Sequence, residues 1–204
     1  MSNRNLIRWG GLLYVLAGLS LVIQQVFHPA QSALPAATVI WVLVHTIGYF
    51  GLALGLLGLV AVYARQKEQA GKLGLVGFVL AFLGNALTVG AAFLDGYLLP
   101  PLLANAPAIL GAPPADPGPL FGGPAGIVIL LSSLIVTVGF VLFGIATWRA
   151  GVLPRWAALI VVLSAWFGIA AIFSPAIFSA GAIVFSIGNA WLGYAVWADP
   201  GQGQ

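Results

Sequence analysis

The sequence predicts an all-α, polytopic membrane protein: a bundle of six transmembrane helices with Gly-rich helix packing. Of its 204 residues, 61% are hydrophobic and 5% are charged, whereas soluble domains carry about 25% charged residues. Apolar runs long enough to cross a bilayer as helices recur along the chain. The short alternating segments of a transmembrane barrel are not found in the sequence.

The six apolar runs define the expected helices of one domain covering residues 1–204. Pro29 and Pro35 mark the first loop, and Pro154 suits the first turn of a helix. We interpret the first run as a spanning helix and not a signal peptide, because Gln24 and Gln25 make a poor approach to a cleavage site. The expected ranges are about 6–27, 38–64, 73–99, 126–148, 154–173 and 176–198, with a charged turn at 65–72 and a Pro-rich outer loop at 100–124.

The basic residues predict the orientation of the chain. With six crossings, both termini and the turns at 65–72 and 149–155 lie on one side of the membrane. All seven Lys and Arg residues fall on that side, which the positive-inside rule makes cytoplasmic. We therefore expect a bacterial inner-membrane protein with cytoplasmic N- and C-termini. The seven are Arg4, Arg8, Arg65, Lys67, Lys72, Arg149 and Arg155.

The second basic turn also carries a resemblance. Residues 149–156 read Arg-Ala-Gly-Val-Leu-Pro-Arg-Trp and follow a Gly-containing helix. This stretch resembles a turn found in uncharacterised bacterial multi-pass membrane proteins. The resemblance implies a bacterial origin, and because those families have no assigned activity it assigns no site residues.

Small residues at helical spacing predict how the second and third runs pack. A short turn makes these helices antiparallel neighbours, and small faces let helix backbones approach closely in lipid. We expect the two stripes to face each other with Gly58 opposite Gly77, which sets His45 level with Ala91 and places Asp95 about one turn further out. The stripes are Gly48, Gly51, Gly55 and Gly58 in one run, and Gly74, Gly77, Ala81, Gly84, Thr88 and Ala91 in the other.

His45 and Asp95 are therefore the leading candidates for a functional site. Ionisable residues inside a membrane are costly and often functional. This pair is interpreted either as a ligand site or proton relay, or as a neutral histidine bonded between helices with Asp95 in the headgroup region. Further candidate ligand-binding residues, on the rim of the same outer region or deeper, are His28, Gln24, Asn85 and Ser132.

Several kinds of chemistry are not expected. The chain has no cysteine, which excludes disulfides and thiolate metal sites. Motifs of hydrolases, zinc peptidases and phosphate-binding loops are missing, so we expect no enzyme, no catalytic residues and no metal ligands. No stretch favours nucleic acid. Haem or pigment ligation by His28 and His45 is a disfavoured alternative, because these residues are expected to differ in depth by about two turns.

The function favoured by the sequence is non-catalytic. The protein is expected either to be a packing subunit of a membrane complex, with membrane lipids and other subunits or further copies as partners, or to bind a lipophilic small molecule. The binding site would be an outer-leaflet pocket among the first four helices. The alternatives are a small transporter or channel for protons or a small solute, and a haem- or pigment-binding subunit.

Overall fold

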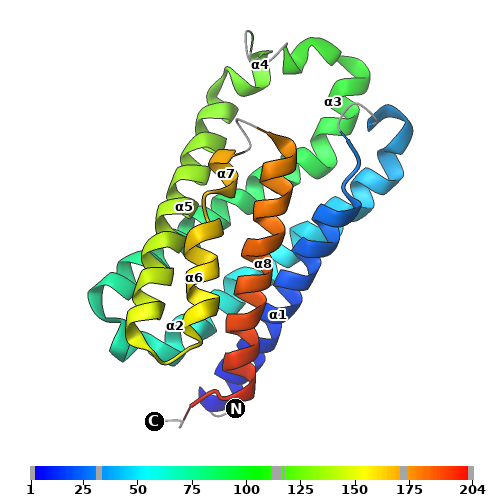
Figure 1. Ribbon diagram of the computed structural model, residues 1–204. Helices are drawn as coiled ribbons and strands as arrows, with labels where there is room; N and C mark the ends of the chain where they lie inside the picture. Colours follow the sequence, from blue (N-terminus) through cyan, green and yellow to red (C-terminus); the bar gives the residue numbers. More distant parts are fainter. Residues whose placement is uncertain (1–2, 31–33, 112–115, 117, 171–173, 202–204) are drawn as a thin grey trace.

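The computed structural model describes residues 3–30, 34–111, 116, 118–170 and 174–201. These residues form helices that lie side by side in an elongated bundle (Figure 1). Four of the helices are long and apolar enough to cross a membrane, as expected for a helical membrane protein. The elements are α1 (Asn3–Phe27), α2 (Leu34–Phe93), the π-helical segment η2 (Leu94–Leu98), α3 (Leu99–Asn105), the 3-10 segment η3 (Pro107–Leu110), α4 (Gly118–Phe121), α5 (Pro124–Ala150), α6 (Arg155–Ser164), α7 (Phe167–Ala170) and α8 (Pro175–Ala198).

Helix α2 contains both the second and the third apolar run, and its helical assignment continues through the charged turn expected at 65–72. The chain nevertheless reverses there, since Gly71 adopts a left-handed conformation with φ of 57°, which glycine accepts without steric cost. The Asn85 side-chain amide donates to the Leu52 carbonyl at 3.2 Å, and the rings of Tyr63 and Phe78 stack at 4.4 Å. The two halves of α2 are therefore antiparallel neighbours, called here the first and second legs.

The expected packing of the two glycine stripes against each other is wrong. The stripe of the first leg faces α1, because a Cβ on Gly51 would come within 2.8 Å of the Ser20 Cβ. The stripe of the second leg faces α5, where a Cβ on Gly84 would lie 2.5 Å from the backbone nitrogen of Val136. The small-residue face of each leg therefore packs against a different helix. The two legs contact each other through other residues. The register in which residues of the first leg lie opposite residues of the second leg is shifted by about one turn from the expected register.

The helix expected over 154–173 is broken. Helix α6 ends at Ser164 and α7 begins at Phe167, while residues 171–173 lie outside the described part of the chain. The Ser164 hydroxyl bonds back to the Ile160 carbonyl at 2.5 Å, a contact that bends helices. The Ala165 carbonyl accepts a bond from the Thr137 hydroxyl of α5 at 3.2 Å. A backbone acceptor released by the break therefore has a partner inside the bundle, which an apolar environment requires.

Substitution Thr137→Val is expected to lower the free energy of unfolding by about 1 kcal/mol, because it removes the side-chain partner of the Ala165 carbonyl. Thr88→Val is the matched control, since the Thr88 hydroxyl bonds only to a carbonyl one turn back in its own helix. Unfolding midpoints in detergent measure both effects. Equal midpoints for the two variants would show that the bond to Ala165 does not stabilise the break.

The Pro-rich segment is more helical than expected. Pro100 and Pro101 do not end the third apolar run, because they occupy the first turn of α3, where the missing amide hydrogens are not needed. Helix α3, η3 and α4 then cross one end of the bundle in short pieces (Figure 1). They cover the end of the molecule that is opposite to the termini.

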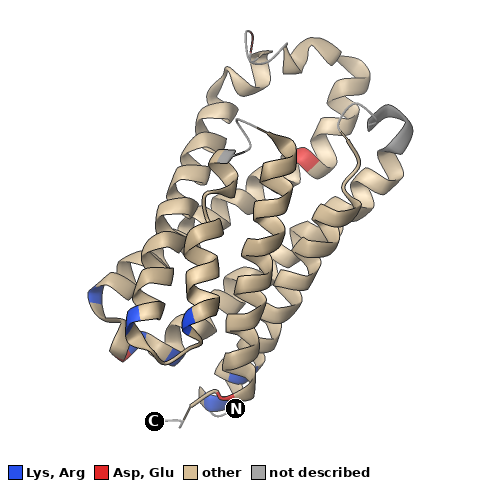
Figure 2. Ribbon diagram, viewed as in Figure 1, with Lys and Arg blue, Asp and Glu red and all other residues tan. Residues whose placement is uncertain are grey.

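The charged residues are divided between the two ends of the bundle. Figure 2 shows Lys and Arg gathered at the end where both termini lie. There the Arg65 guanidinium lies 3.1 Å from the Asp199 carboxylate. The backbone amide of Gly201, together with Arg65, holds the pKa of Asp199 below its usual value. The C-terminal segment is thereby tied to the turn between the legs of α2.

Candidate functional site

The candidate site begins with a local irregularity that carries Asp95. The second leg of α2 passes directly into η2, a single stretch of π-helix, and π-helical turns inside α-helices are frequent at functional sites. The indole N–H of Trp41 donates to the Asp95 backbone carbonyl at 2.9 Å. A Cβ on the next residue, Gly96, would come within 2.7 Å of the His45 Cβ. The widened turn thus brings the backbone of η2 directly against the first leg of α2.

His45 is buried and has a polar neighbour at each ring nitrogen. Its side chain is 1% exposed. Nδ1 lies 2.8 Å from the Trp41 carbonyl oxygen, and Nε2 lies 3.1 Å from the Asp95 carboxylate. The ring also stacks on the Trp41 indole at 4.6 Å between centroids. The sequence placed His45 and Asp95 within a turn of each other, and the structure places them in hydrogen-bonding contact.

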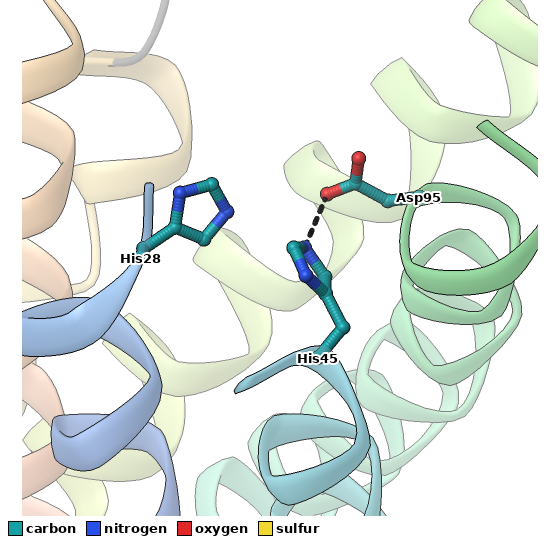
Figure 3. Close-up of side chains that lie close together, drawn as sticks. All are labelled: His28, His45 and Asp95. Atoms are coloured by element: carbon teal, nitrogen blue, oxygen red, sulfur yellow. Dashed lines mark hydrogen bonds and ion pairs between the residues drawn. The ribbon is translucent and has the colours of Figure 1, made fainter. Parts of the chain in front are cut away.

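His28 joins this pair from the segment that follows α1 (Figure 3). Its ring centroid lies 4.9 Å from that of His45 and 4.8 Å from that of Trp41. Its Nδ1 is 2.8 Å from the Pro29 carbonyl oxygen. Burial lowers the pKa of His28 below its usual value, and the nearby His45 lowers it further.

The expectation that His28 and His45 differ in depth by about two turns is wrong, because their rings are in contact. Helix α1 ends at Phe27, directly before His28, and α2 begins at Leu34. His45 lies about three turns from the start of α2, and at that position its ring is level with that of His28. Direct edge contact of the two rings also leaves no space for a porphyrin between them, as bis-histidine haem ligation would need.

The remaining candidates line a cavity beside these residues. The Asn85 side chain bonds to the first leg of α2, and the Ser132 hydroxyl bonds to the Val128 carbonyl of its own helix at 2.6 Å. Gln24 packs against Gly48, since a Cβ on that glycine would overlap the Gln24 amide. His28 and Asp95 also line the cavity. His45 is set back behind Asp95 and is not part of the cavity wall.

The cavity has a volume of about 830 Å³ and lies among α1, α2, α5, α7 and α8. Along α1 its lining extends from Tyr14 to Gln25, with His28 just beyond the end of this helix, and along α8 it extends from Asn189 to Pro175. These stretches correspond to about 17 Å and about 21 Å of helix at 1.5 Å per residue. The cavity is therefore long and runs from the interior of the bundle to the His28–Asp95 end. The sequence predicted a pocket among the first four helices. In the structure, α7 and α8 also form walls of this cavity, so the predicted set of helices was incomplete.

Sequence reasoning missed Trp41, which is 2% exposed and contacts all three residues of the cluster. Its indole N–H holds the Asp95 backbone, its ring stacks on His45, and its edge meets His28. One signal could have found it. Trp41 precedes His45 by four residues, which places both on one helix face.

Comparisons with protein-family models, with curated proteins and with solved structures find no match for this chain. Function must therefore be argued from the geometry of the site.

Proposed function

We propose that this protein is a six-crossing, non-catalytic membrane protein that binds an elongated lipophilic small molecule. The observation that carries the proposal is the cavity of about 830 Å³, a volume within the range of about 300 to 1,000 Å³ typical of small-molecule sites. Its length along α1 and α8 suits a hydrocarbon or isoprenoid chain lying roughly parallel to the helices. The bound molecule would enter from the end that carries His28 and Asp95.

The lining of the cavity supports an apolar body for this molecule. The hydroxyl groups of Ser132, Ser133 and Ser186 in the wall are bonded to carbonyls of their own helices, so these three offer the ligand little hydrogen bonding. At the inner end, Tyr14 donates to the Asn189 amide oxygen at 2.6 Å, and that amide in turn donates to the Phe185 carbonyl. The aromatic and aliphatic side chains of the wall include Leu21, Leu52, Val136, Phe140, Phe167, Phe178 and Phe185.

The opposite end of the cavity supports a polar group on the same molecule. Gln24, Gln25, His28 and Asp95 line it together, and the Asp95 side chain is 47% exposed. An amphiphile with its chain inside the bundle and its polar group at this end would satisfy both regions. The charge distribution supports an orientation with this end outside and the termini in the cytoplasm of a bacterial cell.

The proposal is tested by filling the cavity. The protein is purified in mild detergent, and bound lipophilic molecules are extracted and measured by mass spectrometry. We expect one species enriched over the membrane extract, with roughly one molecule per chain. Ala182→Phe places a ring in the cavity wall and is expected to lower the amount bound by about tenfold.

Ala180→Phe is the matched control, because Ala180 lies on the same helix but is exposed and does not line the cavity. Ala91→Phe fills the cavity from α2 and serves if Ala182→Phe does not fold. No enriched species, or equal binding by the filled and control variants, would contradict the proposal. An absorption spectrum of the same sample tests for haem or pigment directly.

A transport function is the second candidate, and one observation favours it. The break between α6 and α7 lies at the cavity wall, where Ala165 and Phe167 line it, and discontinuous helices mark the binding sites of many transporters. Solute or proton flux into liposomes tests this function. We expect flux to depend on His45 if transport occurs, so a rate unchanged in His45→Ala would exclude a pathway through the cluster.

A further inference from the structure

We propose that His28, His45 and Asp95 form a binding site for one divalent first-row transition-metal ion at the polar end of the cavity. The three residues come from three segments: the connection after α1, the first leg of α2, and η2. One ligand atom from each lies within 4.8 Å of the other two. Figure 3 shows a ring nitrogen of His28 directed toward the space between His45 and Asp95.

The hydrogen bonds of His45 leave a place for a cation. A backbone carbonyl can only accept, so the bond between Nδ1 and the Trp41 carbonyl requires the proton on Nδ1. In the neutral ring, Nε2 then carries a lone pair, and it faces a carboxylate oxygen at 3.1 Å. Two acceptors in contact repel unless a proton or a metal ion lies between them. A metal ion satisfies both without burying an imidazolium at a side chain that is 1% exposed.

His28 shows the same arrangement. Its Nδ1 is directed at the Pro29 carbonyl oxygen at 2.8 Å, which places the proton there and leaves the lone pair on Nε2. Histidines that ligate metals typically donate the second ring N–H to a backbone carbonyl or carboxylate, and this bond fixes the tautomer and the ring orientation. Both histidines therefore already have the outer partner that a metal ligand needs.

The third ligand is fixed by the packing around Trp41. Because the indole N–H holds the Asp95 carbonyl and the indole ring stacks on His45, the carboxylate and the imidazole keep their relative position without a metal. His28 touches the rings of this unit from the segment that follows α1, and its own hydrogen bond is to Pro29. Ligand atoms around a tetrahedral zinc ion are about 3.3 Å apart for bonds of about 2.0 to 2.1 Å. His45 and Asp95 already have this spacing, so closure requires movement of His28 alone.

The donor set indicates the kind of metal. Two imidazole nitrogens and one carboxylate oxygen suit Zn²⁺, Fe²⁺ and Co²⁺ better than Ca²⁺ or Mg²⁺, which prefer oxygen ligands. The chain has no cysteine to offer a softer ligand. Three protein ligands also leave at least one coordination position open. That position faces the cavity, because His28 and Asp95 belong to its wall.

Cobalt(II) provides the test, because its visible absorption reports on coordination. Tag-free protein is stripped of metal with a chelator, returned to detergent buffer and titrated with Co²⁺. We expect visible bands that saturate at one ion per chain and are displaced by Zn²⁺. His45→Ala and His28→Ala are each expected to weaken binding by roughly 100-fold or more. Asn105→Ala, which is exposed in α3 at the same end of the bundle and does not line the cavity, should bind as the wild type does.

His28→Ala keeps the test decisive if His45→Ala does not fold, because His28 meets Trp41 and His45 by ring contacts and its hydrogen bond is to the neighbouring Pro29. No saturable band, or wild-type affinity in His28→Ala, would overturn the proposal and leave His45 and Asp95 as a hydrogen-bonded pair. The outcome is independent of the proposed lipophilic ligand, whose binding is measured on metal-free and metal-loaded protein by mass spectrometry.

Discussion

Substitution Gly77→Leu is expected to abolish the folded protein, with a loss of about 3 kcal/mol or more in the free energy of unfolding. A Cβ on Gly77 would overlap the backbone of Phe143 in α5. A backbone cannot move aside as a flexible side chain can, so the two helices would have to separate. Overpacking a well-packed core already costs about 1 to 3 kcal/mol, and here the contact between the second leg of α2 and α5 would also be lost.

Gly90→Leu is the control on the same helix. No atom lies within 4 Å of a Cβ at Gly90, and the residue is exposed, so this change should alter stability by about 0.5 kcal/mol or less. The yield of monodisperse protein in detergent and the midpoint of thermal unfolding measure both variants. A stable Gly77→Leu protein would show that α2 and α5 do not pack as closely as described.

Single cysteines placed at the two ends of the bundle are expected to react from opposite sides of the membrane. The chain has no native cysteine, so each introduced thiol is the only one present. In intact bacterial cells, a membrane-impermeant maleimide should label Asn105→Cys and leave Glu68→Cys unlabelled. Permeabilised cells should show labelling of both. Both positions are exposed, so a difference between them reports on sidedness and not on burial.

The physical basis for this expectation is the distribution of basic residues. Lys and Arg gather at the end that carries the termini and the turn between the legs of α2 (Figure 2), and such residues are retained in the cytoplasm. Labelling of Glu68→Cys alone in intact cells would show that the orientation is the reverse of the expected one. Labelling of both would show that both positions lie outside and that an even number of crossings separates them.

Much of the fold could be predicted from the sequence, because membrane helices depend on local composition. An apolar run of sufficient length must form a helix in lipid, since each backbone group needs a partner within the same segment. The second and third runs together became α2 and η2, and the fourth and sixth runs became α5 and α8, with ends that differ by at most four residues from those expected. The break after Ser164 could not be predicted, because the partner of the Ala165 carbonyl there is a hydroxyl from another helix, that of Thr137.

The candidate site was predicted in part. The spacing of His45 and Asp95 along two antiparallel helices brought them to within a turn, because helical rise per residue is constant. The expected partner faces were wrong, since a small-residue stripe indicates that a helix will approach closely but not which one. The contact of His28 with His45 depends on the path of the connection after α1. Periodicity carries no information about such a connection.

The amino-acid order alone predicts a helical protein whose helices are apolar enough for a membrane and whose basic residues fall at the helix ends and turns. These properties follow from composition and from order along the chain. The folded chain was needed to show which helices meet, where the cavity lies, and that two histidines and one carboxylate converge at its end. Those features depend on side-chain contacts between segments as far apart as Tyr14 and Asn189, and such contacts are set by packing in three dimensions.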